Sequence, residues 1–271
     1  MSKQRLTITL SNSTINKLDQ LIDKKMVRSR SHAIETILQK ELKPSVNTAV
    51  ILAGGDNTSK LKPLINYQDR PLIFHLIDHL KQYQISNIII LTHNKAQILK
   101  TEILKQFPDT HITYIFEPKP LGTAGALKNI SHLLTQPFYC LHADVFTNIN
   151  LQELAVFHEQ HQGIATISAK PRMPHFSFDN ISVQGSQVIA FQPKSKDPNP
   201  SLVNSGVYLF EPEILNFITN KVPAMLEKDV FPKLVKLNKL FAFSFDGVWL
   251  DVTTEKKYQE DLFLHKTSNQ K

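Results

Sequence analysis

The sequence predicts an α/β fold with a mainly parallel sheet covered by helices on both faces, preceded by a small basic module. Two observations predict the larger part. Apolar runs at residues 49–52 and 88–91 contain no polar residue, which is typical of strands buried on both faces. These runs alternate with stretches of helical apolar spacing. A third observation, a change in charge near Pro44, separates the front module from the rest.

The composition limits the class of protein. Apolar residues make up 41% of the 271 residues, which is enough for a buried core. No run of about 18 apolar residues is present, so we expect no membrane span. The N-terminus lacks the charged-then-apolar pattern of a signal peptide. The single Cys140 cannot form an internal disulfide and indicates a buried residue in the reducing cytoplasm.

The positive charge is concentrated in the front module. The whole chain carries a net charge of +7, and residues 1–43 hold nine Lys or Arg against four Asp or Glu. A basic module in front of a nearly neutral body suggests a polyanionic partner. A solvated basic face is the alternative, and charge alone does not decide between the two.

The front module has the pattern of one strand and two helices. Residues 5–10 alternate strictly between polar and apolar, as in a strand with one covered face. Ser11 or Ser13 is suited to cap a first helix. A second helix is predicted to open at residues 29–31 and to end at Pro44. The apolar positions of the first helix are Ile15, Leu18, Leu21 and Ile22.

Such a module is too small to close a core alone, and its single strand needs a partner. Residues 3–43 resemble the ribbon-helix-helix DNA-binding fold, in which two copies pair their strands. The resemblance implies a homodimer or higher oligomer, and Arg5, Thr7 and Thr9 facing the base edges of duplex DNA. It also implies a phosphate held by the backbone at residues 29–31. A dimerisation module that no longer reads DNA is the alternative.

The larger module begins at residue 46. Its first three predicted strands are residues 49–52, 88–91 and 112–116. Helical spacing occurs between them and again after the third. The last third is richer in strands. The helical apolar positions include Leu72, Leu76, Ile77 and Leu80, then residues 98–104 and 127–134, and the later strands are 163–169, 181–183, 188–191 and 206–210.

A Gly-rich turn follows the first strand of this module. It reads Leu52-Ala53-Gly54-Gly55 and continues through Asn57 and Lys60. Glycine lets the backbone approach an anion, and a strand–turn–helix order points backbone N–H groups at it. No Gly-Lys-Ser or Gly-Lys-Thr follows, so the turn is not a Walker loop.

Two carboxylates close later apolar runs. Asp144 follows the run 138–141, and Asp251 ends the segment 246–251. The carboxyl end of a parallel strand is where ligands bind in open α/β sheets. Magnesium requires only one or two protein carboxylates beside phosphate oxygens. Alone, an Asp at such a position more often caps a helix or a turn, whereas two of them at strand ends suit a divalent metal such as Mg²⁺.

The stretch 117–126, Glu-Pro-Lys-Pro-Leu-Gly-Thr-Ala-Gly-Ala, lies between the Gly-rich turn and Asp144. The order and spacing of all these motifs resemble the sugar-1-phosphate nucleotidyltransferases over residues 46–265. The resemblance implies a Rossmann-like nucleotidyltransferase domain with a mixed, mainly parallel sheet. It also implies transfer of a nucleotidyl group from an NTP to a sugar 1-phosphate, giving an NDP-sugar and pyrophosphate.

The resemblance assigns roles to individual residues. Asp144 and Asp251 would hold Mg²⁺, and the catalytic residues would be Lys60, Arg70 and Asp144. Lys194, Asn204 and Gly206 would bind the sugar phosphate. The form of the 117–126 stretch is most similar to mannose- or heptose-1-phosphate guanylyltransferases, which slightly favours GTP. The implied nucleotide-binding residues are Leu52, Ala53, Gly54, Gly55, Glu117, Gly122 and Thr123.

The chain departs from the family pattern at several positions. Asn57 and Lys60 replace the usual Gly and Arg, and the family's loop is one residue shorter. Arg70-Pro71 stands for Lys-Pro, and Pro193 replaces a sugar-contacting Glu. These departures favour a second hypothesis, a transcriptional regulator. In it the nucleotidyltransferase-like domain senses a nucleotide or sugar nucleotide, and the front module binds DNA.

Overall fold

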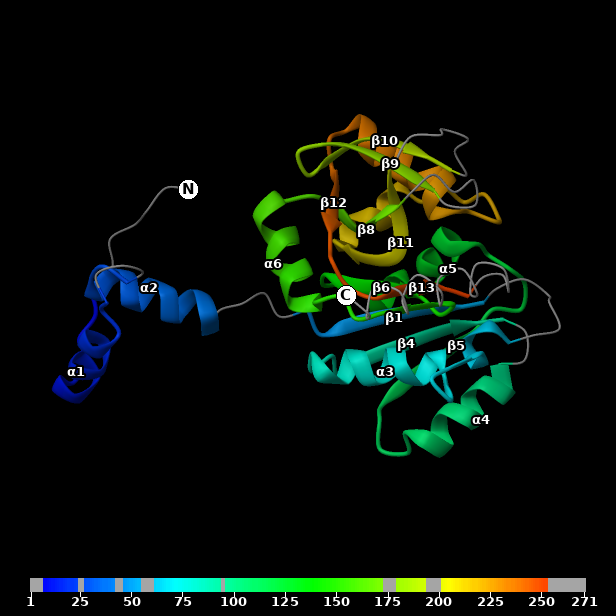
Figure 1. Cartoon of the computed structure of the whole chain (residues 1–271). Coiled ribbons are helices and arrows are strands. Elements are labelled where there is room, and N and C mark those ends of the chain that lie inside the picture. Colours follow the sequence, from blue (N-terminus) through cyan, green and yellow to red (C-terminus); the bar gives the residue numbers. More distant parts are fainter. Residues whose placement is uncertain are drawn as a thin grey trace. The chain divides into compact units, whose positions relative to one another are not determined.

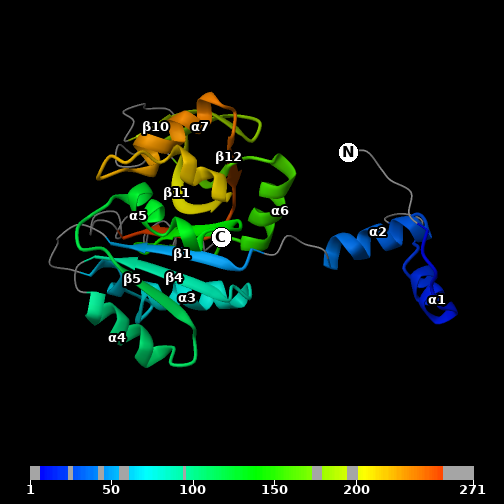
Figure 2. The ribbon, with the colours of Figure 1, turned by 180° about the vertical axis from the view of Figure 1, so that it is seen from behind.

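The structure is a computed structural model that describes residues 7–23, 27–41, 46–54, 61–93, 96–172, 179–193 and 201–252. The chain divides into two compact units, Met1–Pro44 and Ser45–Lys271. Figures 1 and 2 show both units, which are described separately below. No described helix has the length and apolar character needed to cross a membrane.

The described part of unit 1 contains two short helices. Helix α1 spans Asn12–Gln20, and the Ser11 hydroxyl accepts the Thr14 N–H at its start. Helix α2 spans Arg30–Glu41, with the Ser29 hydroxyl 3.2 Å from the backbone nitrogen of His32. Both helices therefore begin at a serine N-cap, which satisfies backbone N–H groups that have no partner within the helix.

The core of unit 1 is small. Leu18 and Ala33 are its buried apolar residues among those described. A forked ion pair joins the helices, with Arg30 nitrogens 2.6 and 2.7 Å from the two Asp19 carboxylate oxygens. Several apolar side chains remain exposed, namely Ile8, Leu21, Ile37 and Leu38. This unit covers little of its apolar surface by itself.

The strand predicted at residues 5–10 is not present in the part of it that the structure describes. Residues 7–10 have no regular secondary structure, and Arg5 lies outside the described residues. The physical reason is that a single copy offers this segment no neighbouring strand, and an unpaired strand has no ladder to stabilise it.

Unit 2 is built on a mixed sheet. Its described strands form a nine-stranded sheet in the order β5-β4-β1-β6-β11-β8-β12-β10-β9. The first four strands in this order are parallel to one another, and β11 is antiparallel to β6. The strands are β1 Thr48–Ala53, β4 Asn87–Thr92, β5 Ile112–Phe116, β6 Phe138–His142, β8 Ala165–Arg172, β9 Asn180–Gln184, β10 Gln187–Gln192, β11 Ser201–Phe210 and β12 Leu240–Ser244.

Helices cover both faces of this sheet (Figure 1). Residues on one face of the parallel strands, such as Ile51, pack with α3, α4 and α6. Residues on the other face, such as Val50, pack with α5 and α7. The predicted α/β class with a mixed sheet is confirmed. The α-helices are α3 Leu72–Gln82, α4 Ala96–Gln106, α5 Thr123–Asn129, α6 Leu151–His161 and α7 Phe231–Lys236, and the short helical turns are η1 Lys62–Leu64, η2 Ser131–Leu133, η3 Pro212–Phe217 and η4 Leu226–Val230.

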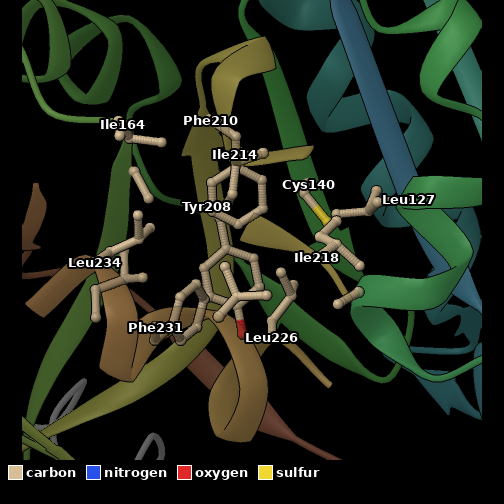
Figure 3. Packing of buried hydrophobic residues seen from close by; sticks show 14 of the residues in the cluster. Leu127, Cys140, Ile164, Tyr208, Phe210, Ile214, Ile218, Leu226, Phe231 and Leu234 are labelled. Carbon is tan, nitrogen blue, oxygen red and sulfur yellow. The ribbon is translucent and has the colours of Figure 1, made fainter. Parts of the chain in front are cut away.

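The core on the α5 and α7 side is rich in aromatic residues (Figure 3). Tyr208 and Phe210 on β11 pack against each other and against Phe231. Full burial of a large apolar side chain contributes about 1.5–3 kcal/mol to stability. Cys140 is fully buried in the same core, as predicted, and burial raises the pKa of its thiol.

Two short strand pairs lie beside the main sheet. Strand β7, Val145–Thr147, pairs with β13, Trp249–Asp251. Strand β2, Asn66–Tyr67, pairs with β3, Arg70–Pro71. An apolar cluster of Tyr67, Leu72, Leu250 and Val252 joins the two pairs. This cluster connects the segment after the Gly-rich turn to the strand that carries Asp251.

Candidate active site

The carboxyl ends of four neighbouring strands meet at one edge of the sheet. Gly54 follows β1, His93 follows β4, Glu117 follows β5, and His142 ends β6. These strands are parallel, so the residues share an edge. Strand β11 runs antiparallel to β6, which brings residues 204–206 to the same place. Ligands bind at this edge in open α/β sheets.

The structure brings the two predicted metal carboxylates together. Asp144 immediately precedes β7, and Asp251 on β13 lies opposite Val145 in the strand pair. The Val252 N–H donates to the Asp144 carbonyl oxygen at 3.0 Å. Asp251 is buried and Asp144 is half-buried.

Burial and neighbouring charged groups shift the pKa of the Asp144 carboxyl. Burial raises the pKa of its carboxyl, the nearby Asp251 raises it further, and His142 and Lys62 lower it. No group of three or more His, Cys, Asp or Glu suited to a metal occurs among the described residues. The donor set is thus a pair of carboxylates. It fits Mg²⁺, whose remaining ligands are commonly water and phosphate oxygens.

The position of Asp251 is fixed by contacts from other strands. The Trp249 indole N–H donates to the Ser205 carbonyl at 2.9 Å, which ties β13 to β11. Lys170 on β8 donates to the carbonyl oxygens of Phe245 and Gly247, at 3.1 and 2.8 Å. These contacts hold the strand that carries the carboxylate.

Lys62 and Arg70 have different surroundings in the structure. Arg70 lies on the β2–β3 hairpin, and its Nη1 is 2.9 Å from the Asp78 carboxylate on α3. Lys62 opens η1 and lies close enough to Asp144 to lower its pKa. Both precede a proline. The sequence assigned a catalytic role to Arg70 and none to Lys62, and the role of Arg70 stays a prediction. Lys60 lies outside the described residues.

Glu117 lies beside Gly54 at the end of β1. A Cβ added to Gly54 would be 3.9 Å from Glu117 Oε2. The side chain is buried, and burial raises the pKa of its carboxyl, opposed by a hydrogen bond from the Leu121 N–H and by His93. Leu52 and Ala53 end β1 as predicted, whereas Gly55 lies outside the described residues.

Gly122 belongs to a tight crossing of two chain segments. Its φ is +81°, and an added Cβ would lie 2.3 Å from the Ala224 carbonyl oxygen. The N–H groups of Ala124 and Gly125, at the start of α5, donate to that same oxygen at 3.0 and 3.1 Å. The small residues of this motif therefore allow the backbone at residue 224 to approach closely. The N–H groups of Ala124 and Gly125 already have an acceptor within the protein.

Thr123 supports another side chain. Its hydroxyl accepts the Leu226 N–H at 2.8 Å and donates to Glu227 Oε2 at 3.2 Å. The hydroxyl proton is thus already used within the protein. In the structure this hydroxyl supports Glu227, and the position of Thr123 beside the nucleotide stays a prediction.

A chain of polar contacts continues from Glu227 across the sheet edge. His142 Nε2 is 3.8 Å from Glu227 Oε1 and 3.3 Å from the Tyr208 hydroxyl. The Asn204 amide donates to that hydroxyl at 2.9 Å and accepts the Gly206 N–H at 3.1 Å. His142 is not among the site residues predicted from the sequence, although it follows a buried run two residues before Asp144.

The two predicted sugar-site residues of β11 lie in a bulge. The register of β11 against β8 shifts between Asn204 and Tyr208, and Gly206 has a φ of +78°. An added Cβ at Gly206 would lie 3.3–3.4 Å from Val145 and His142. A bulge of this kind re-aims side chains at a sheet edge. Lys194 lies outside the described residues.

The sheet, its edge and the paired carboxylates define an α/β nucleotide-binding class of protein. Residues 48–264 match the Nucleotidyl transferase family, and the chain belongs to that family.

Curated relatives agree with this membership. The chain is 31% identical over 236 residues to mannose-1-phosphate guanyltransferase of Saccharomyces cerevisiae, covering 81% of this chain and 64% of the relative. The Kluyveromyces lactis protein of the same name gives the same identity and coverage. The chain thus spans less than two thirds of these relatives' length.

Solved structures share the fold. The crystal structure of HddC from Yersinia pseudotuberculosis in complex with GMP-PN has a TM-score of 0.67 at 20% identity, covering 80% of this chain and 98% of HddC.

Proposed function

We propose that the chain transfers a nucleotidyl group from an NTP to a sugar 1-phosphate, giving an NDP-sugar and pyrophosphate. One observation carries the proposal. The Asp144 and Asp251 pair shares a sheet edge with Glu117 and Gly54, and with the polar chain from Glu227 to Asn204. Glu117 and Gly54 suit a nucleotide, and the polar chain from Glu227 to Asn204 suits a sugar. The two Asp carboxylates suit a metal ion that binds the phosphates.

The reaction is an in-line displacement at the α-phosphorus. An oxygen of the sugar 1-phosphate forms the new P–O bond, and the bond to the β-phosphate oxygen breaks as pyrophosphate leaves. Such chemistry depends mostly on positioning and on neutralising charge. Asp144 and Asp251 would hold Mg²⁺, which supplies positive charge at the phosphate oxygens. Lys62 adds a cation beside them, and Lys60 and Lys194 remain proposed phosphate contacts.

Guanine is the base that we propose for the nucleotide. An ionised carboxylate accepts hydrogen bonds and donates none. Guanine presents two adjacent donors, N1–H and the N2 amino group, and Glu117 can accept both. The names of the curated relatives point to guanine and mannose 1-phosphate, and HddC was solved with GMP-PN.

Pyrophosphate release measured across the four common NTPs, each with mannose 1-phosphate, tests this choice. We expect the highest kcat/KM with GTP, and the GTP preference should fall in Glu117→Gln, in which an amide donor faces the base. Equal rates with all four NTPs would remove guanine recognition from Glu117 and leave the transfer reaction standing.

We also propose that unit 1 is a ribbon-helix-helix module that binds duplex DNA as a homodimer. The exposed Ile8, Leu21, Ile37 and Leu38 beside a small core support pairing with a second copy. The net charge of +5 in residues 1–43 supports phosphate contacts. Thr7 and Thr9 lie in the segment that would pair, together with Arg5.

Removal of residues 1–43 tests this module. The full chain is expected to sediment as a dimer or higher oligomer and to bind duplex DNA with an affinity that falls steeply with salt. The truncated chain should lose DNA binding and keep transferase activity. A monomeric full chain, or DNA binding unchanged by the truncation, contradicts the proposal. If the full chain binds DNA but shows no transferase activity, this result would favour a nucleotide-sensing regulator.

A further inference from the structure

His142 stands between two functional groups of the site. It ends β6 two residues before Asp144, and its imidazole faces Glu227 and Tyr208 across the edge of the sheet. The transfer reaction as proposed above gives the polar chain that contains His142 to the sugar, and gives His142 itself no individual role. Its side chain is 25% exposed and that of Glu227 is 11% exposed, so each is accessible to a ligand.

The distance between these two side chains leaves room for one polar atom. His142 Nε2 and Glu227 Oε1 are 3.8 Å apart, which is longer than a direct hydrogen bond. An oxygen placed about 2.8 Å from both atoms completes a triangle with that base. A hydroxyl group suits this position. It donates one hydrogen bond to the Glu227 carboxylate, and its oxygen accepts one from the Nε2–H of His142.

Both side chains are held in place by residues from other elements. Thr123 at the start of α5 donates to Oε2 of Glu227, while Oε1 faces His142. Asn204 on β11 donates to the Tyr208 hydroxyl, which contacts the His142 ring. Gly206 packs beside His142, since a Cβ there would lie 3.4 Å from His142 Cβ, and its φ of +78° favours glycine at this position. Such support from several elements is what a preorganised binding site requires.

We propose that His142 is a specificity-determining residue of the acceptor subsite. With Glu227 it binds one hydroxyl group of the sugar ring, and it thereby reads the configuration of the carbon that carries that hydroxyl. The inference rests on the proposed function, because it places the sugar of the NDP-sugar beside Asp144. In the epimer at that carbon the hydroxyl points away, so the Glu227 oxygen is left without this partner. A polar site binds such an epimer much more weakly.

Binding of GDP-sugars by calorimetry tests this without requiring turnover. GDP-mannose and GDP-glucose differ only at carbon 2, and GDP-glucose and GDP-galactose differ only at carbon 4. The wild-type full chain should prefer one member of a pair by roughly tenfold or more. His142→Ala should reduce that preference to about threefold or less and leave the affinity for GDP within about twofold.

His142→Asn and His132→Ala provide the comparisons. Asn keeps a polar group but not the reach of the imidazole, so an intermediate preference is expected. His132 is an exposed histidine on η2, and its replacement should change nothing. Melting temperatures show that each variant is folded, and Asn serves if the alanine variant does not fold.

The outcomes separate this inference from the proposed function. A wild-type chain that binds both epimers equally, or a His142 variant that keeps the wild-type preference, overturns the inference. So does a parallel loss of GDP affinity, which would assign His142 to the nucleotide. If the wild-type chain releases no pyrophosphate with any substrate pair, the proposed function fails, while epimer preference in binding still decides the role of His142.

Discussion

Replacing Asp144 or Asp251 with Asn is expected to lower nucleotidyl transfer by about a thousandfold or more. Asparagine keeps the shape of the side chain and removes the negative charge that a Mg²⁺ ligand provides. Asp144 immediately precedes β7, Asp251 lies on the paired strand β13, and Asp251 raises the pKa of the Asp144 carboxyl, so each substitution affects the same site. Initial rates of pyrophosphate release measure the effect.

Asp246→Asn is the matched control for this pair. Asp246 is an exposed carboxylate five residues before Asp251 on the same segment. We expect it to retain the wild-type rate. The melting temperature of the Asp144 variant should remain close to that of the wild type, because this side chain is half-buried and its carbonyl contact is made by the backbone. Full activity in either site variant removes the proposed metal site.

Replacing Lys62 with Ala is expected to lower the rate by about a hundredfold, whereas Arg70→Ala should change it by about threefold or less. Lys62 lies beside Asp144 and is positioned to neutralise phosphate charge. Arg70 forms a half-exposed ion pair with Asp78, and such pairs contribute little. The same pyrophosphate assay compares the two variants.

The comparison of the two basic residues decides which basic–proline pair serves the reaction. Lys62→Arg provides a second comparison, since it keeps the charge and should retain more activity than alanine. A large loss in the Arg70 variant with little loss in the Lys62 variant would restore the assignment that the sequence suggested and contradict the geometry of η1.

Much of the sheet could be predicted from the sequence because its strands are locally distinctive. The fully apolar runs within β1 and β4 are typical of strands buried on both faces of a sheet. The order of Asp144 and Asp251 after such runs indicated their place at the sheet edge. The strand predicted at residues 5–10 is not formed at the described residues 7–10. A strand depends on a neighbour, which one copy of this segment does not supply.

The finer parts of the site depend on contacts between distant residues. The hydroxyl of Thr123 is used by Leu226 and Glu227, about a hundred residues further along the chain, and no local pattern shows this. His142 becomes notable only when Glu227 and Tyr208 stand beside it. Lys62 and Arg70 each precede a proline and differ in their surroundings, so the proximity of Lys62 to Asp144 becomes visible only in the structure.

The central claim is that this chain makes an NDP-sugar. The most direct measurement is phosphorus NMR of the full chain with Mg²⁺, GTP and mannose 1-phosphate, extended to other NTPs and hexose 1-phosphates. We expect resonances of a GDP-sugar and of pyrophosphate that grow together and are absent in Asp144→Asn. Unchanged resonances for every substrate pair, from a folded chain that binds nucleotide, would contradict the claim.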